Sequence, residues 1–211
     1  MGITERKERE KEKRRNDIID AAERVFFSKG QNPATMDDVA EEAELSKGTL
    51  YLYFKSKEEL SMAIKLRGLK ILGEIFIKAI KKYETGIEKI KAIGQAYFQF
   101  YKDYPDYFNT MIYSESCDLD LMNKNSFCTG CHDQGDMALN IVSEALRAGI
   151  ADGTIRPEID PIKTAHILWG QSSGIIQLIA SKGEHIKNEH GLCLDELMLS
   201  AFDLICYSLK K

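Results

Sequence analysis

The stretch TMDDVAEEAELSKGTLYLYF, residues 35–54, contains two short helical patterns separated by a tight break. Thr35 has Asp38 three residues later, which is the spacing of a capping box and predicts a helix start. Ser46 predicts the start of a second helix, in which Leu50 and Phe54 recur four residues apart on one face. Two short helices joined by a tight turn, with a longer helix before them, describe a helix-turn-helix.

The outward residues of the second helix suit contact with double-stranded DNA, because this helix lies in the major groove in such motifs. Residues 45–57 contain no Asp or Glu but three Lys, so the local charge is positive. Gly48 allows close approach of the backbone, and Thr49 offers a hydroxyl and a methyl group to base edges. Tyr51 and Tyr53 can donate hydrogen bonds to phosphate oxygens. The alternative is a plain helical hairpin with a few surface lysines.

Composition limits the other classes of protein. The chain has 211 residues and a formal net charge of -4, so DNA affinity must come from a local patch. Residues 1–17 lack the apolar segment of a signal peptide. Residues 164–181 carry no charged side chain and reach the length of a membrane span, but their polar residues favour a buried helix. We therefore expect a cytoplasmic protein with no membrane partner.

Apolar residues recur at helical spacing along the whole chain, which predicts an all-α fold. The run of charges in residues 5–15 is either a solvated helix or a disordered tail, and a less favoured interpretation is that its basic residues contact DNA phosphates. Residues 182–191 are expected to form a polar loop. About nine helices are expected, at approximately residues 5–30, 36–43, 46–54, 56–80, 85–103, 105–113, 137–148, 160–181 and 192–209.

Residues 14–60 closely resemble the N-terminal DNA-binding domain of TetR-family transcriptional regulators. The resemblance lies in IIDAAERVFFSKG, TMDDVAEEA, SKGTLY and YFKSKEEL, in consistent order and spacing. It implies a three-helix helix-turn-helix domain (residues 1–56) followed by a helical ligand-binding and dimerisation domain (residues 57–211). It also implies a homodimer that binds a palindromic operator, usually as a repressor, and that a small effector releases. One departure is Glu44, where the family usually has Gly in the turn.

Transferred residue by residue, the resemblance predicts two groups of DNA contacts. The base-contact candidates are Lys47, Gly48 and Thr49. The phosphate-contact candidates are Thr35, Ser46, Tyr51, Tyr53, Lys55 and Lys57.

The C-terminal half is rich in aromatic residues, which offer apolar walls with polar groups, as a ligand pocket needs. Some of them must form ordinary core. The last two predicted helices are apolar nearly all round, which favours a dimer interface over a monomer core. The pocket candidates, for a largely apolar or aromatic effector, are Tyr97, Tyr101, Phe108, Met111, Ile112 and Trp169.

The segment CTGCH, residues 128–132, has the Cys-x-x-Cys-His spacing of covalent haem attachment. Without an export signal, haem is the least favoured interpretation, and no cofactor is expected. A tetrahedral metal site would need Cys117, Cys128, Cys131 and His132. A redox switch would need only the two thiols of CTGCH, and unreactive reduced thiols are the simplest interpretation. The sequence shows no nucleophile elbow, phosphate loop or His-Glu-x-x-His motif, so no enzyme is expected.

Overall fold

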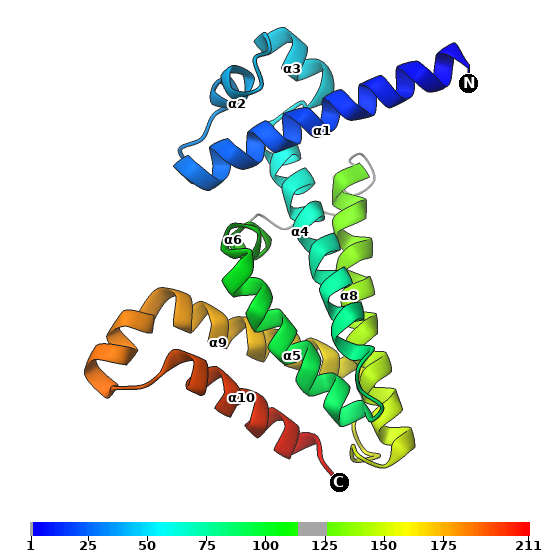
Figure 1. Ribbon diagram of the computed structural model, residues 1–211, viewed down its shortest axis with the longest axis vertical. Helices are drawn as coiled ribbons and strands as arrows, with labels where there is room; N and C mark the ends of the chain where they lie inside the picture. The colour runs from blue at the N-terminus through cyan, green and yellow to red at the C-terminus, as the bar shows by residue number, and fades with distance from the viewer. Residues whose placement is uncertain (1, 114–125) are drawn as a thin grey trace. The chain divides into compact units, whose positions relative to one another are not determined.

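The computed structural model of the chain describes residues 2–113 and 126–211, which form nine helices and one isolated β-bridge (Figure 1). This confirms the all-α prediction. The helices are α1 (Ile3–Lys29), α2 (Met36–Glu42), α3 (Lys47–Tyr53), α4 (Lys57–Ile80), α5 (Gly86–Asp103), α6 (Pro105–Tyr113), α8 (Ser126–Asp152), α9 (Pro161–His190) and α10 (Leu194–Leu209).

The chain forms two compact units, and each is described by itself. The first contains residues 1–68 and 106–132, and the second contains residues 69–105 and 133–211. Both α4 and α8 therefore contribute residues to each unit. The functional division expected at residue 56 does not follow these units and remains a prediction.

The first unit is built around the apolar face of α1. Its side chains pack against α2, which packs in turn against α3, because a single amphipathic helix cannot bury its stripe alone. Arg67 of α4 also pairs with Asp20 of α1 at 2.6 Å. Phe54 stacks on Phe127 of α8 with 5.7 Å between ring centroids. The largest fully buried side chains of this unit are Ile18, Val39, Leu50, Phe54, Leu60, Ile64 and Phe108.

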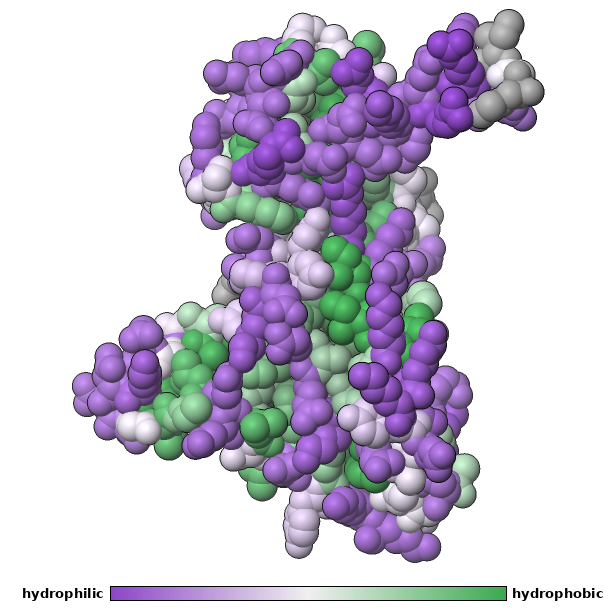
Figure 2. Space-filling view, viewed as in Figure 1, coloured by the Kyte–Doolittle hydropathy of each residue, from purple (hydrophilic) through white to green (hydrophobic). Residues whose placement is uncertain are grey.

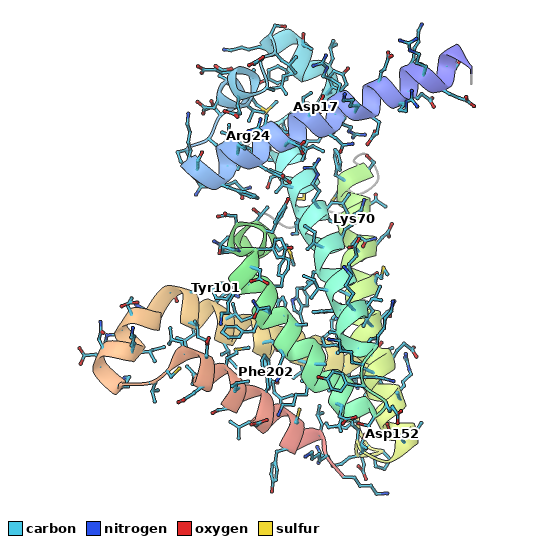
Figure 3. The ribbon with its side chains drawn as sticks, in the orientation of Figure 1. Asp17, Arg24, Lys70, Tyr101, Asp152 and Phe202 are labelled. Carbon is cyan, nitrogen blue, oxygen red and sulfur yellow. The ribbon has the colours of Figure 1, made fainter. Side chains whose placement is uncertain are left out.

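The second unit packs α5 against α9 and α10. Phe202 of α10 lies against Gly94 of α5, where a Cβ atom would come within 2.8 Å of the ring (Figure 3). At the start of α5, a Cβ atom on Gly86 would lie 2.0 Å from the backbone nitrogen of Gly149 in α8. The two helices therefore touch backbone to backbone at this point, and glycine is needed for that approach.

Two predicted boundaries are wrong. Residues 182–191 were expected to form a loop, but α9 continues to His190 and ends at Gly191, whose φ of 63° is left-handed. Gly183 is buried against Leu194, and this tertiary contact holds the polar segment in helical form. The helix expected to begin near Met137 begins at Ser126, so CTGCH is helical.

Candidate functional site

Side-chain caps fix the starts of α2 and α3. Thr35 Oγ1 accepts a hydrogen bond from Asp38 N at 3.2 Å, and Thr35 N donates to Asp38 Oδ2 at 2.9 Å. Lys29 of α1 also donates to Asp38, at 2.7 Å, and hydrogen bonds from Lys29 and Thr35 lower the pKa of Asp38 to about 2. At α3, Ser46 Oγ accepts from Thr49 N at 3.2 Å. Thr35 and Ser46 therefore cap the N-termini of α2 and α3, as the sequence predicted.

Glu44 forms the turn between α2 and α3 in a left-handed conformation, with φ of 54°. Its N–H donates to Glu41 O at 3.0 Å, and the N–H of Leu45 donates to Ala40 O at 2.8 Å. This pair of bonds is a Schellman motif, which closes the end of α2. The turn thus keeps the geometry that usually calls for glycine, although a side chain in this region of φ carries a conformational cost.

The recognition face of α3 is exposed where the sequence predicted it. Leu50 and Phe54 are buried, as expected, and Tyr51 is 43% exposed on the opposite side. A Cβ atom on Gly48 would meet no atom closer than 3.9 Å, so the backbone is open there. Leu52, which is 74% exposed, was not among the predicted contacts. A helical wheel with Leu50 inward would have identified it, because it falls between the two tyrosines on the outer face.

The three lysines of this region are held by neighbours in the free protein. Lys47 pairs with Asp37 at 2.5 Å, and this hydrogen bond raises the pKa of the lysine. Lys55 Nζ donates to the carbonyl of Tyr51 at 2.6 Å. Lys57 forms more hydrogen bonds than the other two, since its Nζ donates to three carbonyl oxygens of the loop between α1 and α2, at 3.1–3.2 Å. Lys57 thus anchors that loop, while Lys47 and Lys55 remain exposed.

The six predicted pocket residues fall into two groups. Phe108, Met111 and Ile112 of α6 belong to the first unit, where Phe108 is fully buried. A Cβ atom on Gly68 would lie 3.4 Å from the sulfur of Met111, so α6 packs closely on α4. The other three, on α5 and α9, belong to the second unit. The structure therefore does not describe the six as one site.

In the second unit, Tyr97 is buried against α9, whereas Tyr101 lines a cavity beside it. Tyr97 is buried, its hydroxyl lies 2.9 Å from Ser173 Oγ, and burial raises its pKa. Tyr101 lines a cavity of about 850 Å³ between α5, α9 and α10 (Figure 3). Trp169, by contrast, is 52% exposed on α9. The other residues that line the cavity are residues 178–186 of α9 and Leu194 of α10.

Comparison with known proteins agrees with the helix-turn-helix geometry. Residues 18–64 match the family described as bacterial regulatory proteins, tetR family. Over these residues the chain has the DNA-binding domain of the TetR family. The family comprises transcriptional regulators that bind DNA and small-molecule effectors and that function as dimers.

Two sequence relatives and one solved structure are similar to this chain over different shares of its length. It is 32% identical over 90 residues to the transcriptional activator FasR of Mycolicibacterium smegmatis, which is 43% of this chain and 41% of FasR. It is 27% identical over 155 residues to the fatty acid metabolism regulator protein of Bacillus subtilis, covering 72% and 76% of the two chains. A crystal structure of FadR from Bacillus subtilis in complex with stearoyl-CoA has a TM-score of 0.69 at 21% identity, covering 90% and 96%. This last similarity shows the fold.

The surface predicted for dimer contact carries large apolar side chains. Figure 2 shows hydrophobic groups on the surface of α9 and α10, interspersed with polar ones. The exposed apolar residues of these two helices are Ile162, Ile167, Trp169, Leu178, Leu199, Leu204 and Tyr207.

Among the described helices, none is long and apolar enough to cross a membrane, and this includes the uncharged residues 164–181 within α9.

CTGCH occupies the first turns of α8, and its side chains point in different directions. Cys128 and Cys131 are buried, whereas His132 is exposed. Cys131 is a free thiol that donates to the carbonyl of Met62 at 3.3 Å, so it is not bonded to Cys128. Burial raises the pKa of Cys131 to about 11. The two cysteine side chains, through which a haem would be attached, therefore face the core, whereas the imidazole that would ligate its iron lies at the surface.

The four-residue metal site cannot be assembled from what the structure describes, since Cys117 lies outside the described residues. Within residues 2–113 and 126–211, no three His, Cys, Asp or Glu side chains gather as metal ligands would. The redox switch between the thiols of CTGCH stays a prediction.

Proposed function

We propose that the chain is a repressor that binds a palindromic operator as a homodimer and is released by a small, largely apolar or aromatic effector. The observation that carries this proposal is the α3 face, with its capped start, open backbone at Gly48 and exposed Tyr51. A helix of this kind inserts its N-terminal residues into the major groove. Residues 1–56 are the DNA-binding part in this proposal.

Lys47 and Thr49 are assigned to base edges, together with Gly48 for close approach. Lys47 has to exchange Asp37 for a phosphate or a guanine, and this exchange costs little because water screens an exposed ion pair. Leu52 joins this group, since an exposed apolar side chain suits a thymine methyl group.

The phosphate contacts are assigned to the surroundings of the recognition helix. Tyr51, Tyr53 and Lys55 lie on or directly after α3. Thr35 and Ser46 present the N-termini of α2 and α3. Lys57 contributes indirectly, by holding the loop before α2.

The effector class to test first is a long-chain acyl thioester. FadR from Bacillus subtilis was solved with stearoyl-CoA, and the cavity beside Tyr101 combines apolar side chains with the charged residues Lys182 and Glu184, of which Lys182 could pair with an anionic group. An apolar chain with an anionic head would suit such a lining. Binding should raise the melting temperature and release DNA, and a panel of aromatic compounds provides the comparison.

A mobility-shift assay with the duplex upstream of the chain's own gene tests the proposed DNA binding. Lys47→Gln and Thr49→Ala should each weaken specific binding by about 5- to 150-fold, because one base contact contributes about 1–3 kcal/mol. Lys82→Gln removes an exposed lysine after α4 and serves as the charge-matched control for Lys47→Gln. Unchanged operator binding in both α3 variants would refute the assignment of α3 as the recognition helix.

A further inference from the structure

The first part of α1 extends beyond the core of the first unit. Residues 4–14 are all exposed, and the buried face of the helix begins only at Ile18. Figure 1 shows this blue end of α1 reaching past α2 and α3. Local bonds support its start, since Gly2 N donates to Glu5 Oε2 at 2.9 Å. The segment is therefore a solvated helix, one of the two forms that the sequence allowed.

The base of this extension is tied to the recognition helix through Arg15. The guanidinium carbon of Arg15 lies 4.3 Å from the ring centroid of Phe127 and 5.6 Å from that of Phe54. Phe54 is the C-cap residue of α3, and the two rings stack on each other. A guanidinium held over aromatic faces is a favourable cation–π arrangement. The direction of the extension is thus fixed relative to α3 within one unit.

Charge on the extension is unevenly distributed. Residues 5–14 contain six Lys or Arg and four Glu, a net charge of +2 within a chain whose formal net charge is -4. Lys7, Lys11 and Arg14 follow one another at spacings of four and three residues, which places them on one stripe of the helix. Glu5, Glu8 and Glu12 form a separate stripe by the same rule.

The Lys7, Lys11 and Arg14 stripe has no ion pair among the described residues, whereas Arg6 is paired with Glu10 at 2.9 Å. The stripe spans about 10 Å of helix axis, at 1.5 Å per residue. Each DNA strand carries a phosphate about every 3.4 Å of its axis, so three cations over this length can meet a matching row of charges.

We propose that Lys7, Lys11 and Arg14 form a second, sequence-independent DNA contact, binding phosphates beside the groove that α3 enters. The proposal rests on the DNA-binding function given above and adds a separate binding element to it. Its occupant is the DNA backbone, because the stripe is positive, forms no ion pair within residues 2–113 and 126–211, and continues into Arg15, which is held against the C-cap residue of the recognition helix. Base edges take no part in this contact.

The test compares two triple variants of the full chain that change the net charge equally. Lys7→Gln/Lys11→Gln/Arg14→Gln removes the stripe, and Arg6→Gln/Arg9→Gln/Lys13→Gln removes three cations from other sides of the same helix. Fluorescence anisotropy gives the dissociation constant for the operator and for an unrelated duplex across a series of KCl concentrations. Circular dichroism checks that both variants keep their helix content.

Removing the stripe should lower the slope of log affinity against log salt by up to about 2.7, since each phosphate contact contributes about 0.9. Affinity for the operator and for the unrelated duplex should fall by the same factor, on the order of tenfold or more at low salt. The matched triple variant should keep the wild-type slope. An unchanged slope after stripe removal, or equal losses in both triples, would overturn the proposal; wild-type protein that binds no duplex would overturn the DNA-binding function as well.

Discussion

Replacing Glu44 with glycine is expected to stabilise the chain, because Glu44 holds the helix-turn-helix turn with φ of 54°. A side chain in the left-handed region costs about 1–2 kcal/mol. Glycine avoids that cost but loses about 0.5–1 kcal/mol more conformational entropy on folding. The net gain in the free energy of unfolding is therefore about 0–1.5 kcal/mol, with a midpoint of about 0.75 kcal/mol. For a chain of this size, the midpoint raises the melting temperature by roughly 1.5–3 °C.

The matched control is Glu44→Ala, which removes the same carboxylate but keeps a Cβ atom in the left-handed turn. Thermal unfolding followed by circular dichroism should show Glu44→Gly melting above both wild type and Glu44→Ala. If the alanine variant gains as much as the glycine variant, the gain comes from charge removal and the backbone argument fails. A destabilised glycine variant would refute it outright.

Three further predictions concern contacts within each of the two units. Gly86→Ala places a Cβ atom 2.0 Å from a backbone nitrogen of α8 and should lower the free energy of unfolding by more than about 3 kcal/mol. The control Gly73→Ala, which meets no atom within 4 Å, should melt at or above the wild-type temperature. Similar melting temperatures for the two variants would contradict the close helix contact. Tyr107→Phe removes a hydroxyl that donates to a carboxylate of α1 at 2.7 Å and should cost about 1.5–3 kcal/mol in urea unfolding, so an unchanged midpoint would count against that bond. Mass spectrometry after alkylation at pH 8 should find the exposed Cys193 modified and Cys131 protected, because burial raises the pKa of Cys131 to about 11. The same shift should lower the free energy of unfolding as the pH rises from about 9 to 11. Fast modification of Cys131 in the folded protein at pH 8 would contradict its burial.

Local signals in the sequence predicted the all-α fold and several helix starts. Thr35 and Ser46 cap the helices that follow them, as predicted, and Asp160 caps the helix that was expected to begin there. Caps are set by hydrogen bonds to residues two or three positions away, so the sequence contains all the information they need. The inward positions of Leu50 and Phe54 follow from helical periodicity alone.

Features that depend on contacts between distant segments were not predictable. The helical form of residues 182–190 depends on Gly183 meeting Leu194, and polar composition alone favoured a loop. Lys57 looked like a free phosphate ligand, but three carbonyl groups about 25 residues earlier in the chain bind it. Tyr101 was predicted to line a pocket, yet its neighbours there come from α9 and α10, which periodicity cannot place.

Footprinting of the purified protein on the DNA upstream of its own gene tests the central claim most directly. The account predicts protection of two related half-sites in inverted orientation, with centres one helical turn of DNA or a multiple of it apart. Thr49→Ala should weaken both half-sites together, since each copy of α3 reads one of them. Absence of any sequence-specific protection at low salt, or protection that survives unchanged in Thr49→Ala and Lys47→Gln alike, would contradict the account.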